Sequence, residues 1–208
     1  MRKDLYILQY EADGLGCPHH LALEMTPPQW EWSAYEPNPM SVPINNTYSA
    51  KITDGEIDRI DFDMYGTNTK YVSTAFLDVC KEHDVTFRAI PLDLRLPDGS
   101  KPEKDYSIFL PGDIVALLDA DKSIAEVERV VETGETMMSV LVPNTPVYSK
   151  ITKFVAKDIA LPHLFLCAEV FSLVCTADFL HTASGRGLRG LKFTPLDDSY
   201  IYDPWADW

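Results

Sequence analysis

The strongest candidate for metal chemistry in the sequence is a short loop that contains Cys17, His19 and His20. A thiolate and two imidazoles are ligands that zinc prefers, and a zinc ion held by three protein ligands can activate water for hydrolysis. A closed zinc site needs four ligands, normally from spaced pairs, and His163 and Cys167 would contribute only if folding brought them close. We therefore expect no metal and no other cofactor, and we keep a metal-dependent hydrolase at this loop as an alternative function.

Two further patterns begin like ligand-binding loops but lack parts that the chemistry requires. Residues 185–190 have the glycine spacing of a dinucleotide-binding loop. However, a helix is predicted before them and a strand after them, the reverse of the order that points helix amides at a phosphate. Residues 119–123 begin like a calcium loop, but Ile124 stands where the sharp turn needs glycine and Val130 where a glutamate should close the site. Both patterns are better explained as turns beside regular elements.

The sequence also contains no recognisable motif for nucleophilic catalysis, since no Gly-x-Ser-x-Gly turn occurs in the chain. The four cysteines show no Cys-x-x-Cys pair, and runs such as 165–168 favour buried, reduced and unreactive thiols. The first apolar run is short and is followed at once by Glu11 and Asp13, so we expect neither a signal peptide nor a membrane span. We predict a cytoplasmic protein that is not an enzyme.

Carboxylates dominate the charge of the chain. Asp and Glu total 32 against 18 Lys and Arg, and the net charge is −14, which argues against binding to nucleic acid or to an anionic membrane. Two clusters of acidic residues are candidate binding sites for a basic partner, and the aromatic rings of the second cluster would anchor that partner. The alternative is that both clusters are ordinary solvated surface and that the rings pack against the protein itself. The first cluster comprises Asp54, Glu56, Asp58, Asp61 and Asp63. The second comprises Asp197, Asp198, Tyr200, Tyr202, Asp203, Trp205, Asp207 and Trp208.

The elements that would hold these clusters are mostly strands, so we predict an α+β fold, largely antiparallel, in a single domain over residues 1–208. Alternation in residues 60–64 predicts a strand with an apolar face and an acidic face toward solvent. Two short helices are predicted at 73–83 and 175–184, each opened by a hydroxyl residue. Strands are predicted at 4–10, 47–53, 57–64, 85–94, 105–110, 113–118, 126–132, 136–142, 163–169 and 189–196.

Two longer segments are less regular. The pattern of residues 125–142 is compatible with a helix or a hairpin, and we favour a hairpin that turns at Thr133 and Gly134. Residues 14–46 contain many prolines and no clear period, and they are predicted to form a long connection anchored by aromatic side chains.

The sequence also contains an internal echo. Segments from 42–98 are similar to segments from 142–198, and each copy combines a short helix with an apolar strand that ends in Pro-Leu-Asp. Spacing of about half the chain predicts two similar halves from an old duplication, with chance similarity as the alternative.

The second copy carries a resemblance to a known family. Its closing run, Gly187-Leu188-Arg189-Gly190-Leu191-Lys192-Phe193-Thr194-Pro195 after a short helix, is similar to the last module of the family-eleven immunity proteins. The similarity in pattern extends over residues 4–198, but only this module is specific. Bacteria encode such proteins beside polymorphic toxins.

The resemblance implies a protein that binds and neutralises a cognate toxin, delivered by contact-dependent or type VI secretion, without performing chemistry itself. The acidic composition directs the expectation toward a basic toxin such as a nuclease. A general protein-binding scaffold without a toxin partner is the remaining alternative.

Overall fold

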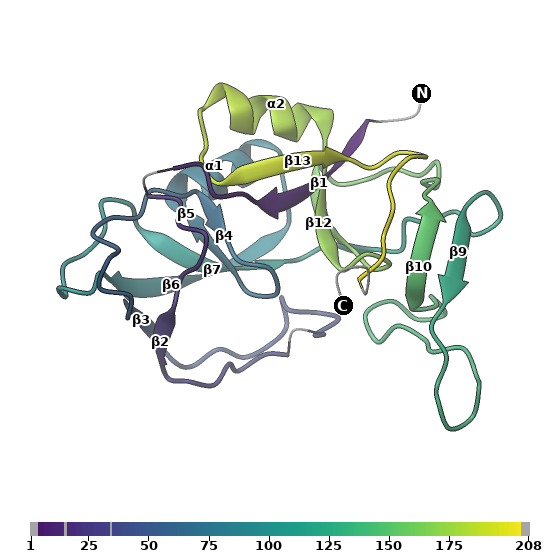
Figure 1. Ribbon diagram of the computed structural model, residues 1–208, viewed down its shortest axis with the longest axis horizontal. Coiled ribbons are helices and arrows are strands. Elements are labelled where there is room, and N and C mark those ends of the chain that lie inside the picture. Colours follow the sequence, from purple (N-terminus) through teal and green to yellow (C-terminus); the bar gives the residue numbers. More distant parts are fainter. Residues whose placement is uncertain (1–3, 15, 34, 205–208) are drawn as a thin grey trace.

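A computed structural model describes residues 4–14, 16–33 and 35–204, which form three β-sheets and two helices (Figure 1). The predicted α+β fold, mostly antiparallel with two short helices, is confirmed. The strands are β1 (Leu5–Tyr10), β2 (Leu23–Thr26), β3 (Tyr48–Ile52), β4 (Met64–Tyr65), β5 (Lys70–Ser73), β6 (Phe87–Arg95), β7 (Tyr106–Pro111), β8 (Ile114–Val115), β9 (Ile124–Val127), β10 (Tyr148–Lys153), β11 (Leu164–Cys167), β12 (Ser172–Thr176) and β13 (Leu191–Pro195); the helices are α1 (Thr74–Glu82) and α2 (Ala177–Gly185).

Both helices begin where the hydroxyl residues predict. The Phe76 amide donates to Ser73 Oγ at 3.2 Å at the start of α1, and the Phe179 amide donates to Thr176 Oγ1 at 3.5 Å at the start of α2. Each cap satisfies an amide that has no partner within the helix, which typically contributes about 1 kcal/mol.

The two larger sheets contain four-stranded units of the same topology. The first unit has the order β4-β5-β7-β6, and the second has the order β11-β12-β1-β13. In each unit a hairpin leads into a helix, and the helix leads to a strand that lies two places away in the sheet. The strand between, β7 or β1, is antiparallel to both of its neighbours.

The two units also share their register. One row across the first unit is Met64, Val72, Ser107 and Pro91, and the corresponding row of the second is Leu164, Cys175, Tyr6 and Pro195. Pro91 and Pro195 therefore occupy equivalent positions, although Pro91 lies in the middle of its strand rather than at the predicted end. Each half of the chain gives its first strand to the other unit, and this strand exchange, which the sequence did not suggest, is compatible with the duplication that remains a prediction.

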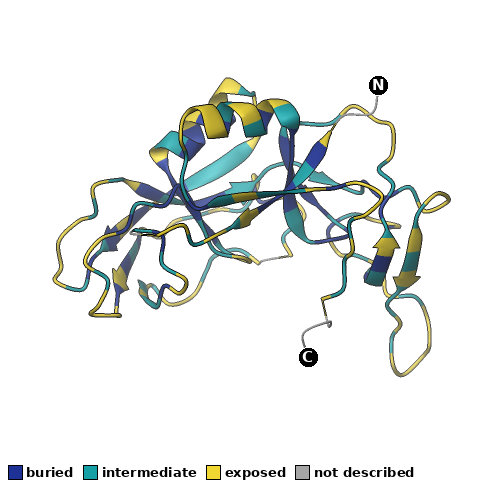
Figure 2. Cartoon of the chain, turned by 45° about the horizontal axis from the view of Figure 1, so that its top comes forward, coloured by how far each residue is buried: buried dark blue, intermediate teal, exposed yellow. Residues whose placement is uncertain are grey.

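The helices pack against each other in a core that both units share. Phe76 of α1 and Phe179 of α2 are fully buried and meet edge to face, with ring centroids 6.0 Å apart. Burial of one such ring contributes about 1.5 to 3 kcal/mol. The outer faces of both helices remain exposed (Figure 2). Two further clusters of buried side chains lie around β3 and β6 and around β10 and β11.

Several predicted strands need correction. Residues 57–63 form no strand, and only Met64–Tyr65 pairs, because this segment packs as an irregular stretch under the loop after α2. A short hairpin surrounds the predicted turn at Thr133 and Gly134, with an antiparallel bridge between Arg129 and Thr136, but residues 136–142 form no strand and β9 pairs with β10. Residues 113–118 form a strand only at β8, followed by an isolated bridge at Leu118. Four strands were not predicted, β2, β5, β10 and β12. All residues of β5 are buried, so the alternation typical of a half-exposed strand is absent there.

Candidate functional site

The first acidic cluster is divided by the fold. Asp54, Glu56 and Asp58 are exposed in the segment after β3, as predicted. Asp63 has only 2% of its surface exposed, and the Asp61 side chain has 25%. The predicted acidic face toward solvent is therefore wrong for Asp63 and only partly right for Asp61, because the segment does not continue as a flat strand.

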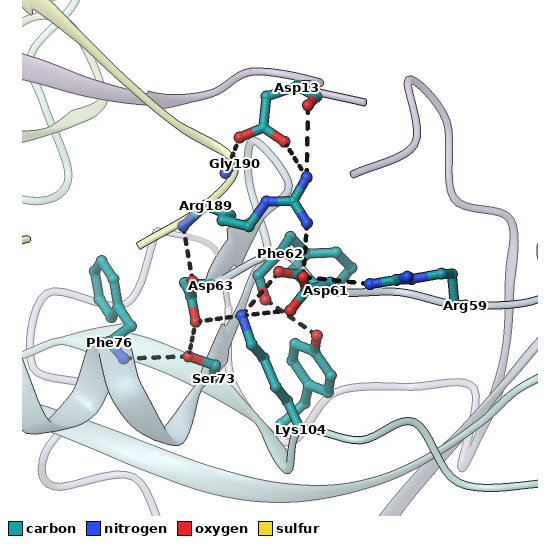
Figure 3. Close-up of polar contacts among 11 residues, drawn as sticks. Asp13, Arg59, Asp61, Phe62, Asp63, Ser73, Phe76, Lys104, Arg189 and Gly190 are labelled. Carbon is teal, nitrogen blue, oxygen red and sulfur yellow. Dashed lines mark hydrogen bonds and ion pairs between the residues drawn. The ribbon is translucent and has the colours of Figure 1, made fainter. Parts of the chain in front are cut away.

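The buried carboxylate of Asp63 lies at the centre of a polar network (Figure 3). It accepts hydrogen bonds from Ser73 Oγ at 2.6 Å, from the Arg189 amide at 2.7 Å and from Lys104 Nζ at 2.9 Å. A buried charge needs such partners, since its loss of hydration is otherwise costly. Ser73 also caps α1, so Asp63 fixes the start of that helix.

Arg189 extends the network to the surface. Its guanidinium donates to Asp61 Oδ2 at 2.6 Å and to Asp13 Oδ1 at 2.9 Å, and Lys104 Nζ lies 2.9 Å from Asp61 Oδ1. Burial alone would raise the pKa of Asp61, but the hydrogen bonds from Lys104 and Arg189 outweigh it and hold that pKa below its ordinary value. We call Asp13, Asp61, Asp63, Lys104 and Arg189 the Asp63 network; its charged groups are directed at one another, so its role is to join the two units.

The glycine-rich closing module has a structural explanation in the same place. Gly190 has φ +74°, and a Cβ atom there would lie about 3.0 Å from the Tyr10 ring and 3.1 Å from the Met64 carbonyl oxygen. Only glycine fits this conformation and this close approach. Leu188, Leu191 and Phe193 are partly buried against the shared core. The module therefore closes the core and positions Arg189.

The second acidic cluster lies mainly against β10. The Tyr200 ring packs edge to face on Phe154 with centroids 6.4 Å apart, and Tyr202 pairs with Ile151. Lys150 Nζ lies 2.8 Å from Asp203 Oδ2. Both tyrosines are half-buried, as in the alternative in which the rings pack back on the body. Asp197 and Asp198 are exposed, and Trp205, Asp207 and Trp208 lie outside the described residues.

Sequence reasoning missed the most exposed apolar surface. Residues 128–147 form an arm that projects from the β9–β10 ribbon, at the opposite end of the molecule from β3 (Figure 1). Of the nine large apolar side chains that are exposed within the described chain, five lie between residues 124 and 140: Ile124, Val131, Met137, Met138 and Val140. Exposed carboxylates of Glu126, Glu132 and Glu135 stand among them. The only signal in the sequence was an apolar pattern that we assigned to the strands of a hairpin.

The apolar and acidic side chains of the arm are suited to contact with another protein. Exposed apolar side chains that stand among polar ones are typical of such contacts. The base of the arm is held by hydrogen bonds from the Glu128 amide to the Val147 carbonyl at 2.8 Å and from the Val147 amide to the Met137 carbonyl at 2.9 Å. The arm is therefore presented on an ordered support.

The residues considered for a metal site are separated. Burial, and then the nearby Asp13 carboxylate, raises the pKa of Cys17 to about 12, whereas His19 and His20 are exposed. His163 is bonded to the N-cap threonine of α2, and Cys167 is fully buried beside Glu169. Within the described ranges, no three His, Cys, Asp or Glu side chains are placed to share a metal ion.

No model of a protein family matches this chain, and no curated protein is significantly similar to it. None of the helices in the described part of the chain is long and apolar enough to cross a membrane.

Proposed function

We propose that this protein is an immunity protein that binds and neutralises a cognate bacterial toxin in the cytoplasm of the cell that makes it. The toxin would be a basic effector delivered by contact-dependent or type VI secretion, and a nuclease fits the acidic surface best. The resemblance of residues 187–195 to the family-eleven immunity proteins suggests the class. The observation that carries the proposal is the arm of residues 128–147, which exposes apolar side chains among carboxylates.

Electrostatics and apolar contact have different parts in this function. The net charge of −14 attracts a basic domain over a distance and speeds the encounter. The exposed Met138 and Val140 side chains, 48% and 66% accessible, would then be covered by the partner and slow its dissociation.

The decisive experiment is co-expression with the product of the neighbouring gene. If that product stops growth of a test bacterium, the protein should restore growth and should co-purify with it. The double variant Met138→Asp, Val140→Asp should lose both effects while keeping the melting temperature of the wild type. Ile159→Asp, at a side chain that is 46% exposed outside the arm, is the matched control and should protect normally. Absence of protection and binding by the wild type would overturn the function, and full activity of the double variant would remove the arm from it.

Two charge reversals separate local steering from net charge. Glu126→Lys, Glu132→Lys, Glu135→Lys changes the arm and the adjacent strand β9, and Asp54→Lys, Glu56→Lys, Asp58→Lys changes the exposed part of the first cluster by the same total charge. Electrostatic attraction is screened beyond about 8 to 10 Å near physiological salt. Only the triple variant whose substituted residues lie nearer the bound toxin should therefore associate with it markedly more slowly. Association rates at low and high ionic strength measure the effect. Equal rates for both variants and the wild type at low salt would show that neither acidic surface steers the toxin.

A further inference from the structure

An open cavity of about 730 Å³ lies where the two units meet, and none of the functions above uses it. It is bordered by the end of β1 (residues 8–10), the β4–β5 hairpin (65–70) and the β11–β12 hairpin (170–173). Its size falls within the range of about 300 to 1,000 Å³ that is usual for small-molecule sites. Each unit thus contributes a hairpin to a hollow that neither would form alone.

The charge of the cavity is opposite to that of the protein. Lys70, Lys192 and His19 line it, and none of its described lining residues is Asp or Glu. In a chain with a net charge of −14, a hollow without carboxylates is unexpected. Lys192 has a carboxylate neighbour, Glu11, at 3.3 Å, but both side chains are about half exposed, so water and salt screen that pair.

Lys70 is the unusual group in the wall. The residue is only 9% exposed, and its ammonium donates to the carbonyl oxygen of Thr67, which also lines the cavity. Among the described residues, Lys70 forms no ion pair, because no carboxylate oxygen lies within 4.0 Å of its ammonium nitrogen. An ammonium has three donors, so two remain for a ligand. A buried cation without a counter-ion is costly unless something else requires it.

The second unit shows that the fold does not require this lysine. Lys70 pairs with Phe109 of the interposed strand β7, and Leu173 pairs in the same register with Leu8 of the interposed strand β1. Leu173, the counterpart of Lys70, is 1% exposed. An apolar side chain therefore satisfies this position in the sheet, and the amine at Lys70 needs a reason other than folding.

The remaining wall is suited to the body of an organic molecule. The Tyr10 and Tyr65 rings pack at 4.6 Å, and the Tyr65 hydroxyl accepts a hydrogen bond from the Leu21 amide at 2.8 Å, which leaves its own proton available. Phe171 at the tip of the other hairpin has φ +47°, a conformation that bulky residues rarely adopt. Phe171 lines the cavity from the second unit, and its ring packs on Tyr35 with centroids 5.2 Å apart.

We propose that this cavity binds a small organic anion, with its carboxylate or phosphate on Lys70 and its apolar body between Tyr65 and Phe171. Lys192 and His19 at the rim add positive charge, and the Tyr65 hydroxyl offers a further donor. The site is independent of the proposed toxin-binding arm, so its test needs no toxin.

Calorimetric titration of the purified protein with benzoate, phenyl phosphate and neutral benzyl alcohol tests the proposal. We expect one or both anions to bind the wild type with an affinity at least ten times that of benzyl alcohol, and the stronger anion identifies the ligand group. Lys70→Leu, which copies the second unit, should lose this binding at least tenfold. Lys70→Met serves the same purpose if the leucine variant folds poorly, and Lys51→Leu, on the exposed side of β3, is the control and should bind as the wild type does.

Three results would overturn the proposal. These are the absence of binding by either anion, equal binding by the Lys70 variants, and equal binding of benzyl alcohol. Each can be distinguished from failure of the toxin experiment, because the arm variants retain the cavity and the Lys70 variants retain the arm.

Discussion

Replacing Lys70 by leucine should make the protein more stable. Burial lowers the pKa of Lys70 from 10.5 to about 8, because the charged amine loses its hydration in the sheet. At about 1.4 kcal/mol for each pH unit, the charged amine costs the folded state about 3 kcal/mol at neutral pH. Leucine is free of this cost, and the equivalent Leu173 shows that its side chain fits the position.

The same cost predicts a dependence on pH. Between pH 8 and pH 10.5 the unfolded chain still binds a proton at Lys70 that the folded protein has released, so the stability of the wild type rises with pH in this window. Below pH 8 both states are protonated, and the full cost is present. The advantage of the leucine variant should therefore be about 3 kcal/mol at pH 7 and should become smaller toward pH 10.

Urea denaturation of the wild type and the variant at pH 7 and pH 10 measures both quantities. Other groups that titrate in this range are shared by the two proteins, so their effects cancel in the difference. The exposed control Lys51→Leu should change the free energy of unfolding by less than about 0.5 kcal/mol at either pH. Equal stability of wild type and Lys70→Leu at pH 7, or a difference that does not vary with pH, would show that the Lys70 amine is hydrated and would refute the reasoning.

Four further results are expected. Asp63→Ala should cost about 3 to 5 kcal/mol in urea denaturation, because it removes the buried acceptor of three hydrogen bonds, and a cost below about 1 kcal/mol would contradict this. Phe193→Ala should lower the melting temperature, at a cost of about 1 to 3 kcal/mol rather than the larger value for a fully buried ring, and an unchanged melting temperature would place the ring outside the core. Burial and the neighbouring His163 lower the pKa of His83, so stability should fall as pH decreases below about 6.5, where the unfolded chain takes up a proton first; His83→Phe should flatten this dependence. Fragments 1–99 and 100–208 should fold when they are mixed, but neither should fold alone, because each lacks the strand, β7 or β1, that the other fragment supplies. Circular dichroism and size-exclusion chromatography can measure this difference.

Local signals predicted the parts of the fold that depend on neighbouring residues. Ser73 and Thr176 predicted the starts of both helices because a side-chain cap acts within three residues. The apolar runs at β1 and β6 predicted strands because both elements bury a face. The echo between the halves predicted two similar parts, and their strand order agrees with that expectation.

Features that depend on distant residues could not be predicted in the same way. The place of Asp63 depends on Arg189, 126 positions away, and on Lys104, 41 positions away. The β9–β10 pairing brings together segments that are each compatible with other partners. Lys70 is an ordinary polar residue in the sequence, and only the register of the two units shows that its counterpart is Leu173.

The exchange of β1 and β7 has a consequence for synthesis on the ribosome. The first unit lacks its central strand until residues 106–111 have emerged, so the chain can complete no four-stranded unit from its first hundred residues. Strand β1 is made first, but one of its two neighbours, β13, begins 181 positions after β1 ends. At translation rates of about 5 to 20 residues per second, one edge of β1 waits roughly 10 to 40 seconds for its partner. An unpaired apolar strand can pair wrongly during that time, and this risk ends only when β12 and β13 have paired with β1.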